Sequence, residues 1–136
     1  RWPLDHAMRP LSIPKGTAVF LGRPAQPMAQ ELSDSIAQMV RGIVGIQEAY
    51  LPQCFVKAVV EPPAQVLVLV LDASANEQSV LNSVGEGLAR VLPKGAHLDV
   101  WPMSDGDSLL GTVRGTRMHV HCQPPPERKR WWKIFG

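Results

Sequence analysis

The run at residues 66–71, VLVLVL, restricts the possible folds of this chain more than any other feature. A short, unbroken apolar run of this kind indicates a β-strand, and the absence of polar alternation indicates burial on both faces. We therefore expect it to be the central strand of a sheet. The chain has 136 residues, which is enough for one domain with a single core.

Two segments have the three- and four-residue apolar spacing of amphipathic helices. The apolar stripe of the first consists of Leu32, Ile36, Met39, Val40 and Ile43, and that of the second of Val80, Leu81, Val84, Leu88, Val91 and Leu92. We place Pro27 in the first turn of the first helix and Gly45 at its C-terminal cap. Either Ser74 or Asn76 is expected to cap the second helix.

Two glycines interrupt the second helical pattern. Gly85 and Gly87 each weaken a helix by about 1 kcal/mol relative to alanine. We expect them where the helix presses closely on the sheet. The sequence Pro-Lys-Gly at residues 93–95 then ends the helix.

The remaining strands are shorter. They are expected at residues 17–21, in one long or two short pieces within residues 46–60 with a break near Pro52, at residues 97–102 and at residues 118–122. Residues 61–64, Glu-Pro-Pro-Ala, read as a hairpin connection, and residues 108–113 as a helical turn. The order β-α-β-β-α-β-β predicts an α+β fold: a mixed or antiparallel sheet of about five strands with both helices on one face.

Proline-rich segments divide the chain into three parts. Residues 1–14 carry three prolines and show no periodic spacing of apolar residues, so we expect an extended N-terminal arm there. Residues 15–123 form a single α+β domain. Residues 124–136 form a proline-rich stop and a basic tail with two tryptophans. The chain begins with Arg1 rather than methionine, so a preceding domain could be missing.

The composition is that of a folded protein and demands no particular partner. Hydrophobic residues make up 45% of the chain and charged residues 19%, and the formal net charge is only +2. Cys54 and Cys122 both lie in apolar strand-like runs, which favours two buried thiols, with a disulfide as the alternative. No apolar run is long enough to span a membrane, and no signal-peptide pattern opens the chain.

Four segments together resemble a known family. They are residues 13–27 (IPKGTAVFLGRPAQP), residues 48–51 (EAYL), residues 66–72 (VLVLVLD) followed by a helix, and the ending at residues 130–136 (RWWKIFG). In this order and spacing they are similar to the C-terminal domain of the SseB, or enhanced serine sensitivity, family. Full-length members usually carry an N-terminal SseB domain, which is not evident here. The resemblance implies a small cytoplasmic bacterial protein with no established catalytic residues.

Histidines on two predicted strands offer a possible metal site. His119 and His121 are two residues apart, so they project from the same face of a strand, while Cys122 points to the other. His97 and Asp99 have the same spacing on another strand. If the two strands are neighbours, all four side chains could converge on a zinc ion, which needs three or four ligands. A solvated polar sheet face explains the same residues, and we favour that interpretation.

The sheet face opposite the helices is a candidate partner surface. The parity of Phe55, Lys57, Val59 and Trp101 places them on one face together with His97 and Asp99. An apolar strip with a polar and aromatic rim is typical of a partner surface or a dimer interface, or of a seat for the arm or tail of the same chain. The sequence leaves these alternatives open.

The tail joins basic charge to large aromatic side chains. Arg130, Trp131 and Trp132 are its candidate contacts, and they could touch an acidic membrane surface, a nucleic acid or a protein groove. Docking of a tail tryptophan back onto the domain is the alternative.

These observations favour a non-enzymatic module that binds a protein or peptide through the open sheet face, its edge strand or the tail, in an accessory or immunity-like role. We expect a protein partner or a homodimer, and no catalytic residue, cofactor or metal. Nucleic acid is not expected as a partner, and a membrane only through weak contact with the tail. The alternatives are a metal- or small-ligand-binding enzyme that uses the histidine and aspartate cluster, and a membrane or nucleic-acid binder that uses the tail.

Overall fold

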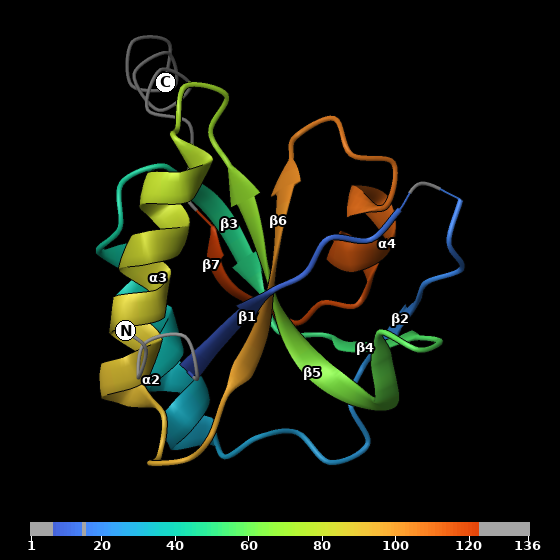
Figure 1. Cartoon of the computed structure of the whole chain (residues 1–136), viewed down its shortest axis with the longest axis horizontal. Helices are drawn as coiled ribbons and strands as arrows, with labels where there is room; N and C mark the ends of the chain where they lie inside the picture. Colours follow the sequence, from blue (N-terminus) through green and yellow to red (C-terminus); the bar gives the residue numbers. More distant parts are fainter. Residues whose placement is uncertain (1–6, 15, 123–136) are drawn as a thin grey trace, which may run out of the picture.

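A computed structural model describes residues 7–14 and 16–122 of the chain (Figure 1). The order of its elements is β1 (Met8–Pro10), β2 (Phe20–Gly22), α2 (Gln30–Arg41), β3 (Ile46–Tyr50), β4 (Gln53–Val56), β5 (Val60–Leu71), α3 (Glu77–Val91), β6 (Leu98–Ser104), α4 (Leu110–Gly115) and β7 (His119–Cys122). None of the helices in the described part of the chain is long and apolar enough to cross a membrane.

The sheet is mixed, as expected for the predicted α+β fold. Its main path runs β1-β6-β5-β3-β7. The strands β1, β6 and β5 are parallel to one another, whereas β3 is antiparallel to both β5 and β7. A branch formed by β2 and β4 pairs with the first half of β5. The described residues form seven strands instead of about five, because β1 was not expected and residues 46–56 form two strands, the second of the two alternatives predicted there.

The longest strand, β5, corrects one prediction. The hairpin connection predicted at residues 61–64 is wrong, because these residues continue the strand from Val60 to Leu71. The turn lies earlier, where the N–H of Val59 bonds to the carbonyl of Val56 at 2.9 Å and Ala58 takes a φ of 68°. Prolines are tolerated here because the first half of β5 pairs on one side only, with β4.

Both long helices cover one face of the sheet, as predicted (Figure 1). Their apolar stripes meet the inward side chains of β3, β5 and β6 in one cluster, whose largest fully buried members include Ile36, Val40, Ile46, Leu67, Leu69, Val84 and Leu88. Asn76 caps α3, since its side chain accepts a hydrogen bond from the N–H of Ser79 at 2.9 Å. The cap of α2 is Gly42 rather than Gly45.

The opposite face of the sheet is covered by the chain itself. A second cluster joins the other side chains of β5 and β6 to α4 and to the segment that follows β1; it contains Leu11, Tyr50, Cys54, Val56, Val60, Val66, Val68, Val70, Trp101, Met103, Leu110 and Val113. The alternation along residues 66–71 therefore places leucines under the helices and valines under the second cover. Burial of this strand on both faces is confirmed.

The segment before the first predicted strand contributes to the sheet. Met8–Pro10 adds β1 in parallel to β6, and the N–H of Leu11 continues this pairing with the carbonyl of Val100 at 2.7 Å. The next strand, Phe20–Gly22, is shorter and later than the predicted residues 17–21. Part of the extended arm thus belongs to the folded unit.

Candidate functional site

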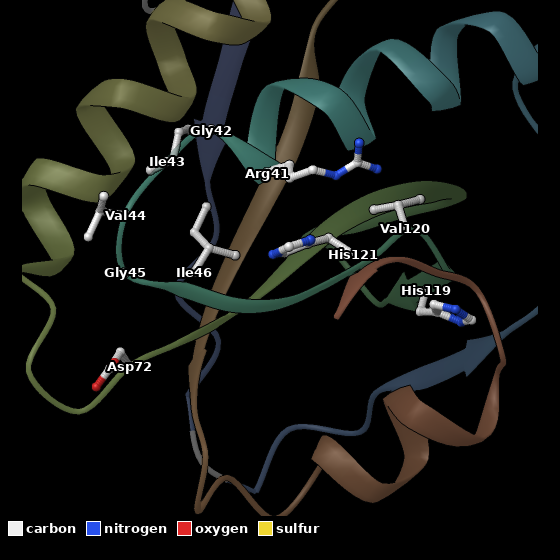
Figure 2. Close-up of a pocket in the computed structure, with 10 residues that line it drawn as sticks. All are labelled: Arg41, Gly42, Ile43, Val44, Gly45, Ile46, Asp72, His119, Val120 and His121. Atoms are coloured by element: carbon white, nitrogen blue, oxygen red, sulfur yellow. The ribbon is translucent and has the colours of Figure 1, made fainter. Parts of the chain in front are cut away.

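A groove of about 710 Å³ lies between the end of α2, the loop that follows it and the terminal strand β7 (Figure 2). It is lined by residues 41–46, by Asp72 and by residues 119–121. The helix α2 packs beside β7, so the groove runs along the edge of the sheet. We take it as the candidate site.

One wall of the groove is the tightly wound end of α2. The N–H of Gly42 bonds to the carbonyl of Met39 at 3.2 Å, and that of Ile43 to the carbonyl of Val40 at 3.1 Å. These short-range bonds satisfy carbonyls of the last turn and end the helix at Arg41. The guanidinium therefore sits on the last helical residue, exposed on the rim of the groove.

The loop after α2 turns at a glycine with a left-handed backbone conformation. Gly45 has a φ of 105°, and a Cβ there would lie only 3.0 Å from Cβ of Ala75. Its carbonyl accepts a hydrogen bond from the N–H of Asp72 at 2.8 Å, which ties the loop to the end of β5. The loop presents Val44 to solvent with 94% of its surface exposed. A large apolar side chain thus stands unburied beside the groove.

The two histidines of β7 do not share a face, although their spacing predicts that they do. His121 pairs with Ala49 and His119 with Tyr50, so the extra residue Val120 forms a bulge. Paired residues of neighbouring strands point to the same side. Because Ala49 and Tyr50 lie in opposite cores, the bulge turns the two imidazoles apart, as Figure 2 shows.

The charges in the groove are concentrated near the end of α2. Burial and the positive charge of Arg41 lower the pKa of His121 from its usual value, while the backbone of Ile46 partly offsets this. Asp72 is engaged in its own turn, where one carboxylate oxygen accepts hydrogen bonds from the N–H and the hydroxyl of Ser74 at 3.0 and 3.2 Å. The groove therefore presents a cation, an imidazole whose protonated form is disfavoured, and apolar side chains.

The four candidate metal ligands do not converge. His97 is exposed ahead of β6 and Asp99 lies within it, whereas His119 and His121 lie on β7. Two strands, β5 and β3, separate β6 from β7. Among residues 7–14 and 16–122, no group of three or more histidine, cysteine or acidic side chains is placed to hold a metal ion.

Asp99 is a buried carboxylate with a local partner. It faces Arg9 across the parallel β1–β6 pairing, and Nη2 of this arginine donates to Oδ2 at 2.6 Å and to the carbonyl of Val59 at 3.1 Å. Its other oxygen is buried with no partner among the described residues. The negative charge of Asp99 adds to burial in raising the pKa of the free thiol Cys54 to about 11. The ion pair of Arg9 and Asp99 joins β1 to β6.

The predicted partner residues do not form one exposed surface. Trp101 is only 7% exposed, inside the second core, and Val59 packs against the same core. Phe55 points to the other side of β4, where its ring lies 6.1 Å from that of Phe20, and Lys57 is exposed in the following turn. The shared face predicted for these residues does not form. Cys54 and Val56 of β4 point into the second core, so Phe55, which lies between them, points away from it. Their role as partner contacts stays a prediction.

The tail candidates Arg130, Trp131 and Trp132 lie outside the residues that the structure describes. The same holds for the side chain of Cys122.

A polar cluster that the sequence analysis did not predict ties α4 to the sheet. Nε and Nη2 of Arg114 donate to the two carboxylate oxygens of Glu48 at 3.0 and 2.7 Å, and the hydroxyl of Tyr50 donates to the same carboxylate. The Arg114 bonds hold the pKa of Glu48 below its usual value against the opposing effect of burial. Burial, followed by the bond to Glu48, raises the pKa of Tyr50 to about 12. The i, i+2 spacing of the acid and the tyrosine was the only signal in the sequence.

Comparison with known proteins identifies a family but no annotated relative. Neither the search of curated proteins nor that of solved structures gives a match. The family model of the SseB protein C-terminal domain matches residues 13–124. This range begins just after β1 and includes every other described element, among them the groove and the Glu48 cluster. The chain therefore belongs to the SseB protein C-terminal domain family.

Proposed function

We propose that this chain is a protein-interaction module that binds an extended segment of a partner protein along β7. The observation that carries this proposal is the groove beside a terminal strand. β7 pairs with β3 on one side, and within the described ranges no strand pairs with its other edge. An unpaired edge offers backbone N–H and C=O groups to an incoming strand, and adjoining pockets can select its alternate side chains.

The distribution of apolar surface supports the same place. Both faces of the sheet are filled by the chain's own clusters, so a partner has no open face to occupy. Val44, almost fully exposed on the groove wall, would lose water contact when a strand is added beside it. Phe20, 63% exposed, is the other large exposed hydrophobic side chain among the described residues, and it lies on β2, remote from the groove.

The test uses the complete chain and random octapeptides displayed on phage. Peptides enriched on the immobilised protein are titrated into isotopically labelled protein, and amide shifts are followed by NMR. We expect shifts concentrated in β7 and in residues 41–46. Val44→Asp should weaken binding roughly tenfold, since burial of a valine is worth about 1.5 kcal/mol. The matched variant Phe20→Asp should bind like the unmodified chain.

Other outcomes overturn the proposal. Failure to enrich any peptide, or shifts that avoid β7, would show that this edge is not a peptide site. Two other occupants of the groove are also tested. A mass that doubles with concentration, and returns to that of a monomer in Val44→Asp, would identify a second copy. Tighter peptide binding after deletion of residues 124–136 would identify the chain's own tail.

A further inference from the structure

We infer that the partner segment carries a carboxylate, which is bound between Arg41 and His121. This inference rests on the proposed peptide site and adds the chemistry by which that site selects its partner. Figure 2 places both side chains on the stretch of the groove that adjoins α2. The two residues line the same groove, and the positive charge of Arg41 is one of the causes, after burial, that lower the pKa of His121.

Charge complementarity favours an anion at this end of the groove. The charged and titratable side chains that line it are Arg41, Asp72, His119 and His121. Asp72 is occupied by its bonds to Ser74, and it lies at the other end of the loop in Figure 2. An arginine presents a planar fork of donors that matches a carboxylate in two parallel bonds. An extended segment with one acidic group could therefore pair its backbone with β7 and its carboxylate with Arg41 on the rim.

Binding of this group would be linked to protonation of His121. The groups that act on this imidazole are Arg41 from α2 and the backbone of Ile46 from β3, and His119 lies on the other face of the bulged strand. In the free protein burial, and after it the charge of the arginine, lowers the pKa of His121 and so disfavours the imidazolium. A bound carboxylate would reverse that effect and raise the pKa of His121. Between the free and the bound pKa values, binding takes up a proton, so affinity should rise as pH falls through this window.

The experiment compares three octapeptides of alternating threonine and valine. The first has a central glutamate and an amidated end, the second a central glutamine and a free terminal carboxylate, and the third a central glutamine and an amidated end. The first two separate a side-chain carboxylate from a chain terminus. Calorimetry between pH 8 and pH 5.5 gives the affinities, and the NMR signal of the His121 ring gives its pKa.

We expect at least one carboxylate peptide to bind roughly tenfold or more tightly than the amide peptide, as charge-assisted bonds imply. Arg41→Gln should remove this preference, whereas Arg41→Lys should retain part of it. Affinity should rise by no more than about tenfold per pH unit on acidification. His121→Asn should flatten this dependence, and the matched variant His119→Asn should not.

The outcomes separate the two proposals. Equal affinity of all three peptides, with amide shifts still in β7, would overturn the carboxylate inference and leave the peptide site standing. A preference that survives Arg41→Gln would also overturn it. Absence of binding by all three peptides would count against the peptide site itself.

Discussion

Glu48 shows how a single side chain decides the position of a distant element. It accepts hydrogen bonds from Tyr50 on its own strand and from Arg114 on α4, which lies 66 residues further along the chain. The arginine side chain is 46% exposed and the glutamate only 13%. The pair therefore sits at the border of the core, where hydrogen bonding contributes more than the screened charge attraction does.

Replacement of this acid should destabilise the fold measurably. Glu48→Gln removes the charge that both donors share, and we expect the free energy of unfolding to fall by about 1–2 kcal/mol. The loss should be seen in urea titrations at pH 7. Since the pKa of Glu48 is lowered in the folded state, its contribution should disappear as pH falls below about 4.5 through the folded-state pKa. The variant and the unmodified chain should then converge.

Asp105 provides the control for this prediction. It also approaches Arg114, at 3.5 Å, but its side chain is 74% exposed. Asp105→Asn should change the free energy of unfolding by less than about 0.5 kcal/mol. Equal losses in the two variants would mean that general charge, rather than the buried hydrogen bonds, fixes α4.

Sequence reasoning reaches only part of such arrangements. The spacing of Glu48 and Tyr50 shows that they share a face, but nothing local identifies Arg114 as their partner. The histidines of β7 illustrate the converse error. Their two-residue spacing is sound for a regular strand, and a bulge at Val120 cancels it. A bulge depends on how β7 pairs with β3, and the sequence of one strand alone does not reveal that pairing.

The contact between α2 and α3 explains one of the two glycines of α3. Both were expected to lie against the sheet, and Gly85 does face Met8 on β1, but a Cβ on Gly87 would meet Cγ of Met39 on α2 at 2.5 Å. A Cβ on Gly85 would meet only the terminal methyl of Met8, at an ordinary 3.5 Å. One glycine therefore permits close helix packing, and the other is free of such a demand.

Alanine substitutions at these two positions should change the free energy of unfolding in opposite directions. Gly85→Ala should raise the free energy of unfolding by up to about 1 kcal/mol through helix propensity. Gly87→Ala gains the same propensity but forces Met39 aside, and since overpacking costs about 1–3 kcal/mol, we expect net destabilisation. The midpoints of urea denaturation measure both changes in stability. Combining Gly87→Ala with Met39→Ala should relieve the clash, and an equal gain from both single variants would refute the role of the close contact.

Elements with a strong period were predicted well, and those without one were not. The apolar stripes place α2 and α3, and the run at residues 66–71 places the centre of the sheet. The prolines at positions 62 and 63 suggested a connection, yet β5 continues through them because that half of the strand pairs on one side only. Whether a proline interrupts a strand depends on its neighbours in the sheet rather than on its own sequence.

The layered arrangement of the whole molecule follows from the same central strand. Its leucines and valines require two covers. The sequence identifies the helical one and leaves the chain's own arm as one of several candidates for the other. The second cover combines a short helix, α4, with side chains from the irregular segment after β1, such as Leu11. Neither piece has enough periodicity to be assigned to a core in advance. For this reason the sequence left open whether a partner or the chain itself covers this face, and it named the edge strand as a binding place without indicating the groove beside it.

Burial of Cys54 in this second cover makes global stability depend on alkaline pH. Its pKa is raised to about 11 from 9.0, chiefly by burial, whereas in the unfolded chain the thiol ionises near its ordinary value. Unfolding therefore releases a proton between pH 9 and pH 11, and the free energy of unfolding should fall by up to about 1.4 kcal/mol per pH unit in that range. Tyr50, with a pKa of about 12, adds a similar fall above pH 10.

Cys54→Ala separates the two contributions. The smaller side chain lowers stability at every pH, so the slope and not the absolute value is the measurement. Urea titrations at pH 8, 9 and 10 should give a steeper fall from pH 9 to pH 10 in the unmodified chain than in the variant. Above pH 10 both proteins should lose stability, because Tyr50 remains in each. If the slopes between pH 9 and pH 10 are equal, the thiol is not held neutral by the folded core, and tyrosine ionisation alone accounts for the alkaline limit.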